Sequence, residues 1–195
     1  MGDLVGTAQR KMNRARDRDA STCGLWSFSL DFYERAGVAT ALIALQDEAE
    51  INVNLVLFAV WLGLSGRGRL DKEAVAEAER AIGSISAEVI EPLRTLRRRL
   101  RMVSDTDIQC LRESIKAIEI DAERAAQARL AALAPPPSEA DPSQRQADAE
   151  TNLMLYLGLK AATNPHGAIV HRELQRYALR TSSSLSSLSA SRPSA

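Results

Sequence analysis

Hydrophobic residues recur with a helical period along most of the chain. In the segment 38–49 they stand at i, i+3, i+4, i+7 and i+11, which predicts an amphipathic helix with one buried face. The next segment, 53–64, carries apolar residues on every side, and such a helix has to be covered all round. We therefore expect 53–64 to be the central helix of a bundle, with Asn52 as its N-cap and a glycine-containing turn at 66–68 as its end.

Capping residues and helix breakers predict further helices on both sides of this centre. The expected ranges are about 27–35, 72–83, 86–103, 107–134, 148–162 and 168–180. Two consecutive helices carry apolar stripes of the coiled-coil kind, and the short break between them predicts an antiparallel hairpin. The first stripe consists of Val89, Leu93, Leu96, Leu100 and Val103, and the second of Ile108, Leu111, Ile115, Ile118 and Ala122.

Shifts in composition predict how the chain is organised. We expect an all-α, compact helical bundle around a short buried central helix, with disordered polar tails. The expected parts are a disordered basic arm (1–24), the bundle domain (25–134), a Pro-rich linker (135–147), C-terminal helices (148–180) and a Ser-rich disordered tail (181–195). The sequence leaves open whether the C-terminal helices dock on the bundle.

Charge and composition narrow the class of protein. Lys and Arg number 25 and Asp and Glu number 25, so no overall charge selects nucleic acid or an acidic membrane. Two cysteines do not form the disulfide framework of a small secreted protein. The longest apolar run, 55–64, reaches half of the ~20 residues that a membrane-spanning helix needs, and no apolar run follows the basic start of the chain. We therefore expect a cytoplasmic protein without membrane contact.

Arginines are concentrated on one stretch of the chain. Arg94, Arg98 and Arg101 form a stripe at i, i+4 and i+7 of a helix, and Arg97 flanks it. Arginine forks bind carboxylate and phosphate equally well, so the stripe has two interpretations. It pairs with the acidic face of the following helix, or it binds an anion, a nucleic-acid backbone or an acidic partner.

The first interpretation predicts a register. An antiparallel hairpin places Arg98 near Glu113, and Arg94 near residues 117–119. The second requires these arginines to remain open to a ligand. RNA sites usually add exposed aromatic side chains for stacking, and only 4% of the residues are aromatic, so nucleic acid is the less favoured ligand.

Polar side chains gather around the start of the central helix. They are Gln46, Asp47, Asn52 and Asn54. They either cap helix ends, as Asn and Asp commonly do, or line a small-molecule pocket where unpaired N–H groups favour anions. Trp26 and Trp61 could form part of such a pocket as a ligand clamp, although indole rings are more often part of a core.

Signatures of catalysis and metal binding are weak. His166 and His171 lack the i, i+4 spacing and the glutamate of a zinc helix, and the glycines at 66 and 68 lack the third glycine of a dinucleotide fingerprint. Glu119 and Glu123 share one helix face, but a magnesium-dependent all-α synthase needs facing acidic clusters on two helices. We expect no catalytic residues, no metal and no cofactor.

Several short motifs resemble a known family. They are residues 26–30, Tyr33, Gly37-Val38, Leu45-Gln46-Asp47, Val53-Asn54-Leu55, Trp61, Pro92-Leu93-Arg94, Arg97-Arg98 and the segment 119–123. Together they resemble a bacterial family of short proteins known only as a domain of unknown function, over about residues 26–133 and more loosely near residues 152–153. The chain departs from that pattern at 48–51, where relatives have a Gly-Leu-Asp-like turn. The resemblance implies a helical fold and a bacterial cytoplasm, and it supplies no catalytic residues.

The first expectation for function is therefore a non-enzymatic helical module that binds a protein partner or itself. The alternatives are anion or nucleic-acid binding by the arginine stripe, and a small-molecule pocket near Asn54. A cleft that Arg94 and Arg98 share with Asn54 would favour the pocket over the other two hypotheses. Pairing of these arginines with Glu113 and Glu119 would instead weaken both charged hypotheses.

Overall fold

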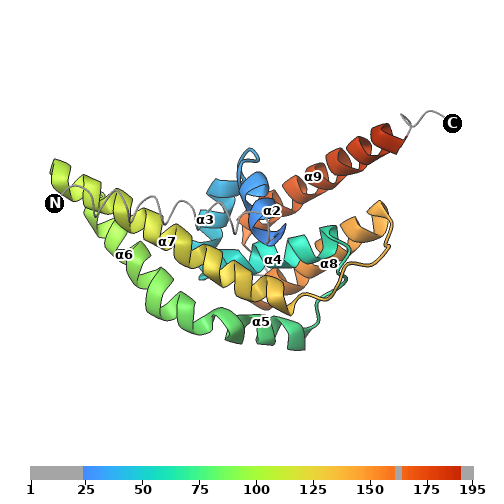
Figure 1. Ribbon diagram of the computed structural model, residues 1–195, viewed down its shortest axis with the longest axis horizontal. Coiled ribbons are helices and arrows are strands. Elements are labelled where there is room, and N and C mark those ends of the chain that lie inside the picture. The colour runs from blue at the N-terminus through green and yellow to red at the C-terminus, as the bar shows by residue number, and fades with distance from the viewer. Residues whose placement is uncertain (1–23, 161–163, 190–195) are drawn as a thin grey trace, which may run out of the picture.

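The computed structural model describes residues 24–160 and 164–189, and every regular element in those ranges is a helix (Figure 1). The all-α fold predicted from the sequence is confirmed. The elements are α2 (Gly24–Tyr33), α3 (Val38–Ala49), α4 (Val53–Leu64), α5 (Lys72–Ile85), the π-helical turn η1 (Ser86–Ile90), α6 (Glu91–Leu100), α7 (Thr106–Leu133), α8 (Pro142–Lys160) and α9 (Pro165–Ser189). The basic arm predicted at the start of the chain falls almost entirely outside the described residues.

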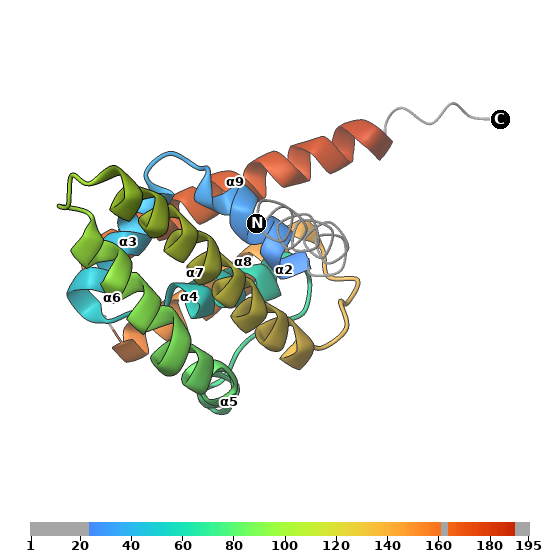
Figure 2. The same ribbon diagram turned by 60° about the vertical axis from the view of Figure 1, so that its left-hand side comes forward.

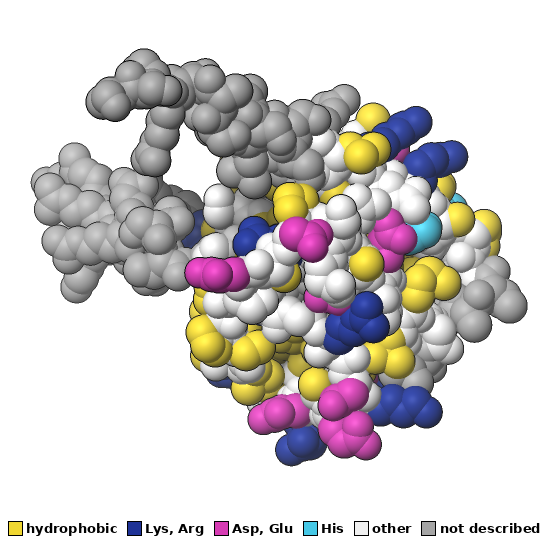
Figure 3. All heavy atoms as spheres, turned by 90° about the vertical axis from the view of Figure 1, so that its right-hand side faces the viewer, with side chains coloured by type: hydrophobic (Ala, Val, Ile, Leu, Met, Phe, Trp, Pro, Cys, Tyr) yellow, Lys and Arg dark blue, Asp and Glu magenta, His cyan; other side chains and the backbone are white. Residues whose placement is uncertain are grey.

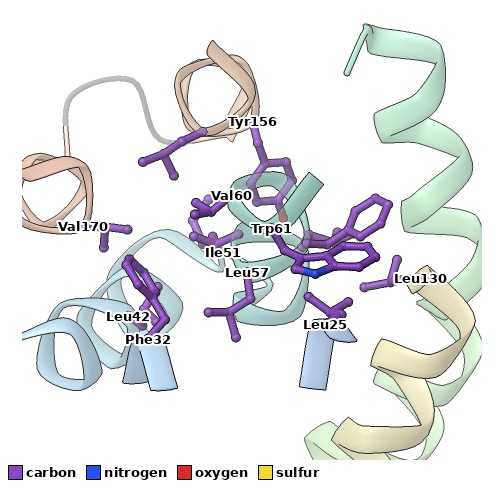
Figure 4. Packing of buried hydrophobic residues seen from close by; sticks show 14 of the residues in the cluster. Leu25, Phe32, Leu42, Ile51, Leu57, Val60, Trp61, Leu130, Tyr156 and Val170 are labelled. Carbon is purple, nitrogen blue, oxygen red and sulfur yellow. The ribbon is translucent and has the colours of Figure 1, made fainter. Parts of the chain in front are cut away.

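The apolar helix α4 is the centre of the bundle, as predicted. Every side chain from Leu55 to Leu62 is buried, and Val60 is fully inaccessible. Its N-cap is Asn52, whose side-chain oxygen accepts a hydrogen bond from the backbone N–H of Asn54 at 3.0 Å. Around it, α2, α3, α7, α8 and α9 each contribute apolar side chains to one core (Figure 4). The all-round apolar pattern thus corresponds to a helix that is covered on every side.

The C-terminal helices are part of this core. α8 makes the most extensive helix–helix contact in the described structure, along α4, and α9 packs on α3 and α8. The side chain of Asn152 is fully buried and holds the segment after α4: it accepts from the Leu70 N–H (2.7 Å) and donates to the carbonyls of Gly68 (3.0 Å) and Ala59 (3.2 Å). The question that the sequence left open is answered, because both helices dock on the bundle.

The segment between α7 and α8 is shorter than the linker predicted at 135–147. α8 already begins at Pro142, since proline is well tolerated in the first turn of a helix. The side chain of Asp141 caps this end of the helix by accepting a hydrogen bond from the backbone N–H of Gln144. The preceding loop is fixed to the turn after α4, where the N–H and hydroxyl of Ser138 both donate to the Gly66 carbonyl at 2.8 Å. α9 begins at Pro165 and continues to Ser189, beyond the end expected at 180.

The hairpin of α6 and α7 forms as predicted, but its interface differs from the predicted apolar seam (Figure 2). Leu96 is 45% exposed, and Leu111 and Ile118 on α7 are also exposed. The buried side chains of α6 and the turn before it are instead Ile90 and Arg94. Each lies one residue after a position of the seam, so the helix is turned by roughly 100° from the predicted orientation. Ion pairs between the helices, described below, replace the hydrophobic contact that the pattern implied.

The other boundaries agree closely with prediction, with one unexpected feature. α5 runs through the π-helical turn η1 directly into α6, and Pro92 lies in the first turn of α6. A π-turn widens the helix, which lets a proline follow without interrupting the rod. In the described residues no helix is both long and apolar enough to cross a bilayer.

Candidate functional site

A cleft of about 640 Å³ lies where α2, α3 and the start of α4 face the α6–α7 hairpin. Its size is typical of small-molecule sites. It brings together most of the residues that the sequence singled out, because the hairpin folds back over the N-terminal end of α4. The lining residues are Trp26, Ser29, Leu30, Tyr33, Glu34, Ile43, Gln46, Asp47, Val53, Asn54, Leu57, Arg94, Arg97, Arg98, Arg101, Arg112, Lys116, Glu119, Ile120, Glu123 and Gln127.

Four arginines enter the cleft from α6 and the residue after it. Arg94, Arg97, Arg98 and Arg101 stand at i, i+3, i+4 and i+7, so they share one side of the helix. Arg94 is buried and lies deepest. Its Nε donates to Glu119 at 3.2 Å, and its two Nη atoms donate to Glu91 (2.6 Å) and Glu123 (2.8 Å).

Arg97 completes this network on Glu119. It forms a two-bonded fork with the carboxylate, through Nε at 2.5 Å and Nη2 at 3.0 Å. The pairing of Arg94 with α7 agrees with the register predicted from the sequence. Arg98 does not: it pairs with Asp47 at the end of α3 instead of Glu113. Arg98 reaches across the cleft to α3 instead of pairing with α7. The sequence did not predict this contact, because it depends on how α3 packs against α6.

Three groups in or next to this network have shifted pKa values. Burial raises the pKa of Glu123, and the charge of Arg94 opposes that shift. Burial also raises the pKa of the Tyr33 phenol to about 12, with the charge of Glu123 acting in the same direction. The hydrogen bond to Glu119 raises the pKa of Arg97 further above its usual range. The carboxylates thus stabilise the guanidinium charges, and Tyr33 remains a neutral donor.

A chain of amides and a hydroxyl forms the floor of the cleft. Ser29 on α2 donates to the side-chain oxygen of Gln127 on α7 at 2.9 Å, and Gln127 donates to the side-chain oxygen of Asn54 on α4 at 3.0 Å. All three side chains are buried. This chain ties three helices together and fixes the orientation of Asn54.

Two basic side chains in the cleft have a donor without an acceptor in the described residues. The Arg112 Nε is buried without a hydrogen-bond partner, and buried donors in folded proteins are almost always satisfied. The Arg101 side chain is exposed and has no ion pair within residues 24–160 and 164–189. An acidic molecule in the cleft would supply an acceptor to both side chains.

The mouth of the cleft is open to solvent. Leu30 on α2 and Ile43 on α3 are about half exposed there, although both are large and apolar. Arg98 and Asp47 are also about half exposed, with side-chain accessibilities of 48% and 42%. Burial therefore increases from this rim to the floor at Asn54 and Gln127.

Two predicted site residues lie elsewhere. Asn52 caps α4 and donates to the Ser86 hydroxyl at 3.2 Å. Trp61 packs in the core against Phe58, with Arg67 stacked over its ring at 4.9 Å. Trp26 lines the cleft and is covered by Arg124, also at 4.9 Å. The two tryptophans therefore do not form a clamp.

Some lining residues could not be recognised in the sequence. Ser29 and Gln127 are ordinary polar positions of a helix, and 98 residues separate them. Arg112 and Lys116 stand one turn apart on α7. The same spacing of basic residues is common on helices that face solvent, so it does not indicate a site. Within the described residues, no cluster of His, Cys, Asp and Glu has the arrangement of a metal site.

The rest of the surface contrasts with the cleft. On the face in Figure 3, acidic and basic side chains are interspersed with hydrophobic ones, as expected for a chain with zero net charge. The cleft instead has six basic lining residues and four acidic ones. The local excess of positive charge is therefore a property of this site.

Comparison with known proteins identifies a family but no activity. No curated protein and no solved structure matches the chain. The family described as "Protein of unknown function (DUF2390)" matches residues 24–130, a range that contains every residue lining the cleft. The chain therefore belongs to this family of proteins of unknown function.

Proposed function

We propose that the protein is a binding protein that holds a small organic anion in the cleft between α2–α4 and the α6–α7 hairpin. The observation that carries this proposal is the basic lining of the cleft, in which the Arg101 guanidinium has no ion pair within the described residues and the Arg112 Nε is buried without a hydrogen-bond partner. A molecule with one acidic group supplies both the negative charge and the acceptors that these side chains need.

Binding is favoured over catalysis by the state of the acidic residues. Glu119 accepts three hydrogen bonds from Arg94 and Arg97, and Glu123 accepts one from Arg94. Both carboxylate oxygens of Glu119 are occupied by guanidinium donors, so this side chain is poorly placed to take a proton from a ligand. The network instead makes the floor of the cleft rigid, which lowers the entropic cost of binding.

A fluorescence titration of the full chain with anilinonaphthalene sulfonate tests the proposal, because this dye combines an apolar ring system with one acidic group. We expect saturable binding that Arg101→Gln weakens about fivefold or more, as for a charge-assisted contact. Arg99→Gln is the matched control, since Arg99 is exposed on the same helix but does not line the cleft.

Equal affinity of the Arg101→Gln and Arg99→Gln variants would overturn the proposal, because the dye would then bind outside the cleft. Saturable binding of a short single-stranded RNA that displaces the dye would favour the nucleic-acid alternative. We expect no such displacement, since acidic residues interrupt the basic lining.

A second candidate function is protein–protein interaction through the outer face of the α6–α7 hairpin, defined by Leu96, Met102, Leu111 and Ile118. All four are exposed, Met102 at 86%, and none lines the cleft. Exposed apolar side chains that gather on one face are typical of interaction sites. Size-exclusion chromatography with light scattering tests self-association. Self-association through this face would be excluded if the protein is a monomer at high concentration and Leu111→Asp does not change the measured mass.

We also propose that the protein acts in a bacterial cytoplasm. The family resemblance supports this, and the exposed free thiol of Cys110 suits a reducing compartment. Cell fractionation with an antibody against the full chain tests the location.

A further inference from the structure

The mouth of the cleft has two chemically different sides. Leu30 and Ile43, from α2 and α3, present exposed apolar side chains. Across from these helices, α6 and α7 present Arg98, Arg101 and Lys116. A ligand that enters therefore meets apolar side chains next to Glu34 on one side and basic side chains on the other.

One acidic side chain occupies the basic side. Asp47, from the C-terminal end of α3, accepts a hydrogen bond from Nη2 of Arg98, and this contact bridges the mouth between α3 and α6. Both side chains are about half exposed, so water screens the ion pair and it is weak. An incoming anion can replace Asp47 at little cost, because the released carboxylate returns to water.

We infer that the ligand is an amphipathic organic anion, whose acidic group displaces Asp47 from Arg98 and whose apolar body lies on Leu30 and Ile43. The inference rests on the proposed function of the cleft and adds the ligand class and the role of Asp47. Asp47 is then a specificity-determining residue, because it competes with the acidic group of the ligand for Arg98, whereas a neutral molecule does not need to displace it.

The affinities of two related dyes test the role of Asp47. Anilinonaphthalene sulfonate carries the acidic group, and phenylnaphthylamine has the same ring system without it. Asp47→Asn removes the competing charge, so we expect the sulfonate to bind about two- to fivefold more tightly, the range of an exposed ion pair. The affinity for the neutral dye should remain unchanged.

Glu48→Gln is the matched control. It removes the same charge at the next residue, but Glu48 faces His166 at 3.4 Å and does not line the cleft. Equal tightening by both substitutions would show a general charge effect and overturn the inference. Unchanged affinity in Asp47→Asn would also overturn it. If Arg101→Gln still weakened binding in that case, the proposed function would stand.

A third variant tests the apolar side. Ile43 is half exposed, so Ile43→Asn should leave the fold intact while weakening both dyes about threefold or more through lost apolar contact. Leu179→Asn is the control, because Leu179 is exposed on α9 away from the cleft. Unchanged affinity of both dyes in Ile43→Asn would contradict the amphipathic class.

Discussion

Gly63 on α4 lies directly against the backbone of Ala149 on α8: a Cβ atom at Gly63 would be 2.1 Å from the Ala149 nitrogen and 2.3 Å from its Cα. The absence of a side chain at Gly63 therefore sets how closely the two helices approach. Because backbone atoms cannot turn aside as a flexible side chain can, any larger residue has to separate the helices.

Gly63→Ala should consequently destabilise the protein by about 3 kcal/mol, the upper range for overpacking. Gly83→Ala is the matched control, since a Cβ at Gly83 meets no atom within 4 Å in an exposed helical position. It should stabilise by about 0.4–1 kcal/mol, because alanine restricts the unfolded chain. Urea unfolding followed by circular dichroism measures both. Equal stability of the two variants would contradict the tight contact of α4 with α8.

Asn152 gives a second test of how α8 is joined to the bundle. Asn152→Ala removes three buried hydrogen bonds and leaves the Leu70 N–H without its acceptor, which should cost about 1–3 kcal/mol. Thr151→Ala alters the adjacent exposed residue and should change the stability by less than about 0.5 kcal/mol. Thermal unfolding compares them, and a loss of similar size in both would argue against a specific role of Asn152.

Burial of α4 can be tested at its own positions. Leu57 is nearly inaccessible, so Leu57→Ala should cost about 2–5 kcal/mol through lost contacts and a cavity. Val60→Asp should prevent folding, because it places an unpaired carboxyl at a fully buried position. Leu96→Ala, at a half-exposed position on α6, should have a small effect. A folded Val60→Asp protein would show that α4 is not the covered centre.

Glu119 on α7 holds α6 against α7 through Arg94 and Arg97. Glu119→Gln leaves the partly buried Arg97 without its forked carboxylate partner, and the free energy of unfolding should fall by about 3 kcal/mol. This is the lower range for a broken buried ion pair, because Arg94 keeps its ion pairs with Glu91 and Glu123. Glu91→Gln alters an exposed carboxylate of the same network and should cost at most about 1 kcal/mol. Chemical denaturation measures the difference, which should vanish if the network is merely a surface feature.

Glu123 should contribute a specific pH dependence. Its pKa is raised above 4.5 by burial, so between 4.5 and the raised value the folded state binds more protons than the unfolded state. The stability that this group contributes is therefore present below pH 4.5 and lost as the pH rises through the raised pKa. Melting temperatures from pH 4 to pH 7 should fall more for the wild type than for Glu123→Gln. Parallel curves would contradict the raised pKa.

The hairpin shows where sequence patterns were sufficient and where they failed. The alternating apolar stripes correctly predicted two antiparallel helices with a short connection. They placed Leu96 and Ile118 inside, whereas both are exposed and Arg94 is buried instead. The register of the hairpin did predict that Arg94 lies near Glu119, but the periodicity of apolar residues does not show that this ion pair is buried.

The cleft was predicted in part for a similar reason. Arg94, Arg98 and Asn54 were recognised by residue type and spacing, and the structure brings them to one place. Asp47 was noted as a capping or pocket residue, but its pairing with Arg98 depends on how α3 meets α6. Ser29 and Gln127 carry no local signal, because the hydrogen bond between them joins helices that are distant in sequence.

The sequence alone determined the helices, their caps and the central place of α4, since these follow from local hydrogen bonding and from the need to cover an apolar surface. The tertiary structure decided which faces meet. It turned α6 so that its arginines face the cleft, placed α8 against Gly63, and left the Arg112 Nε in the cleft without an acceptor. These features arise from the packing of helices far apart in the chain, and no local pattern encodes that packing.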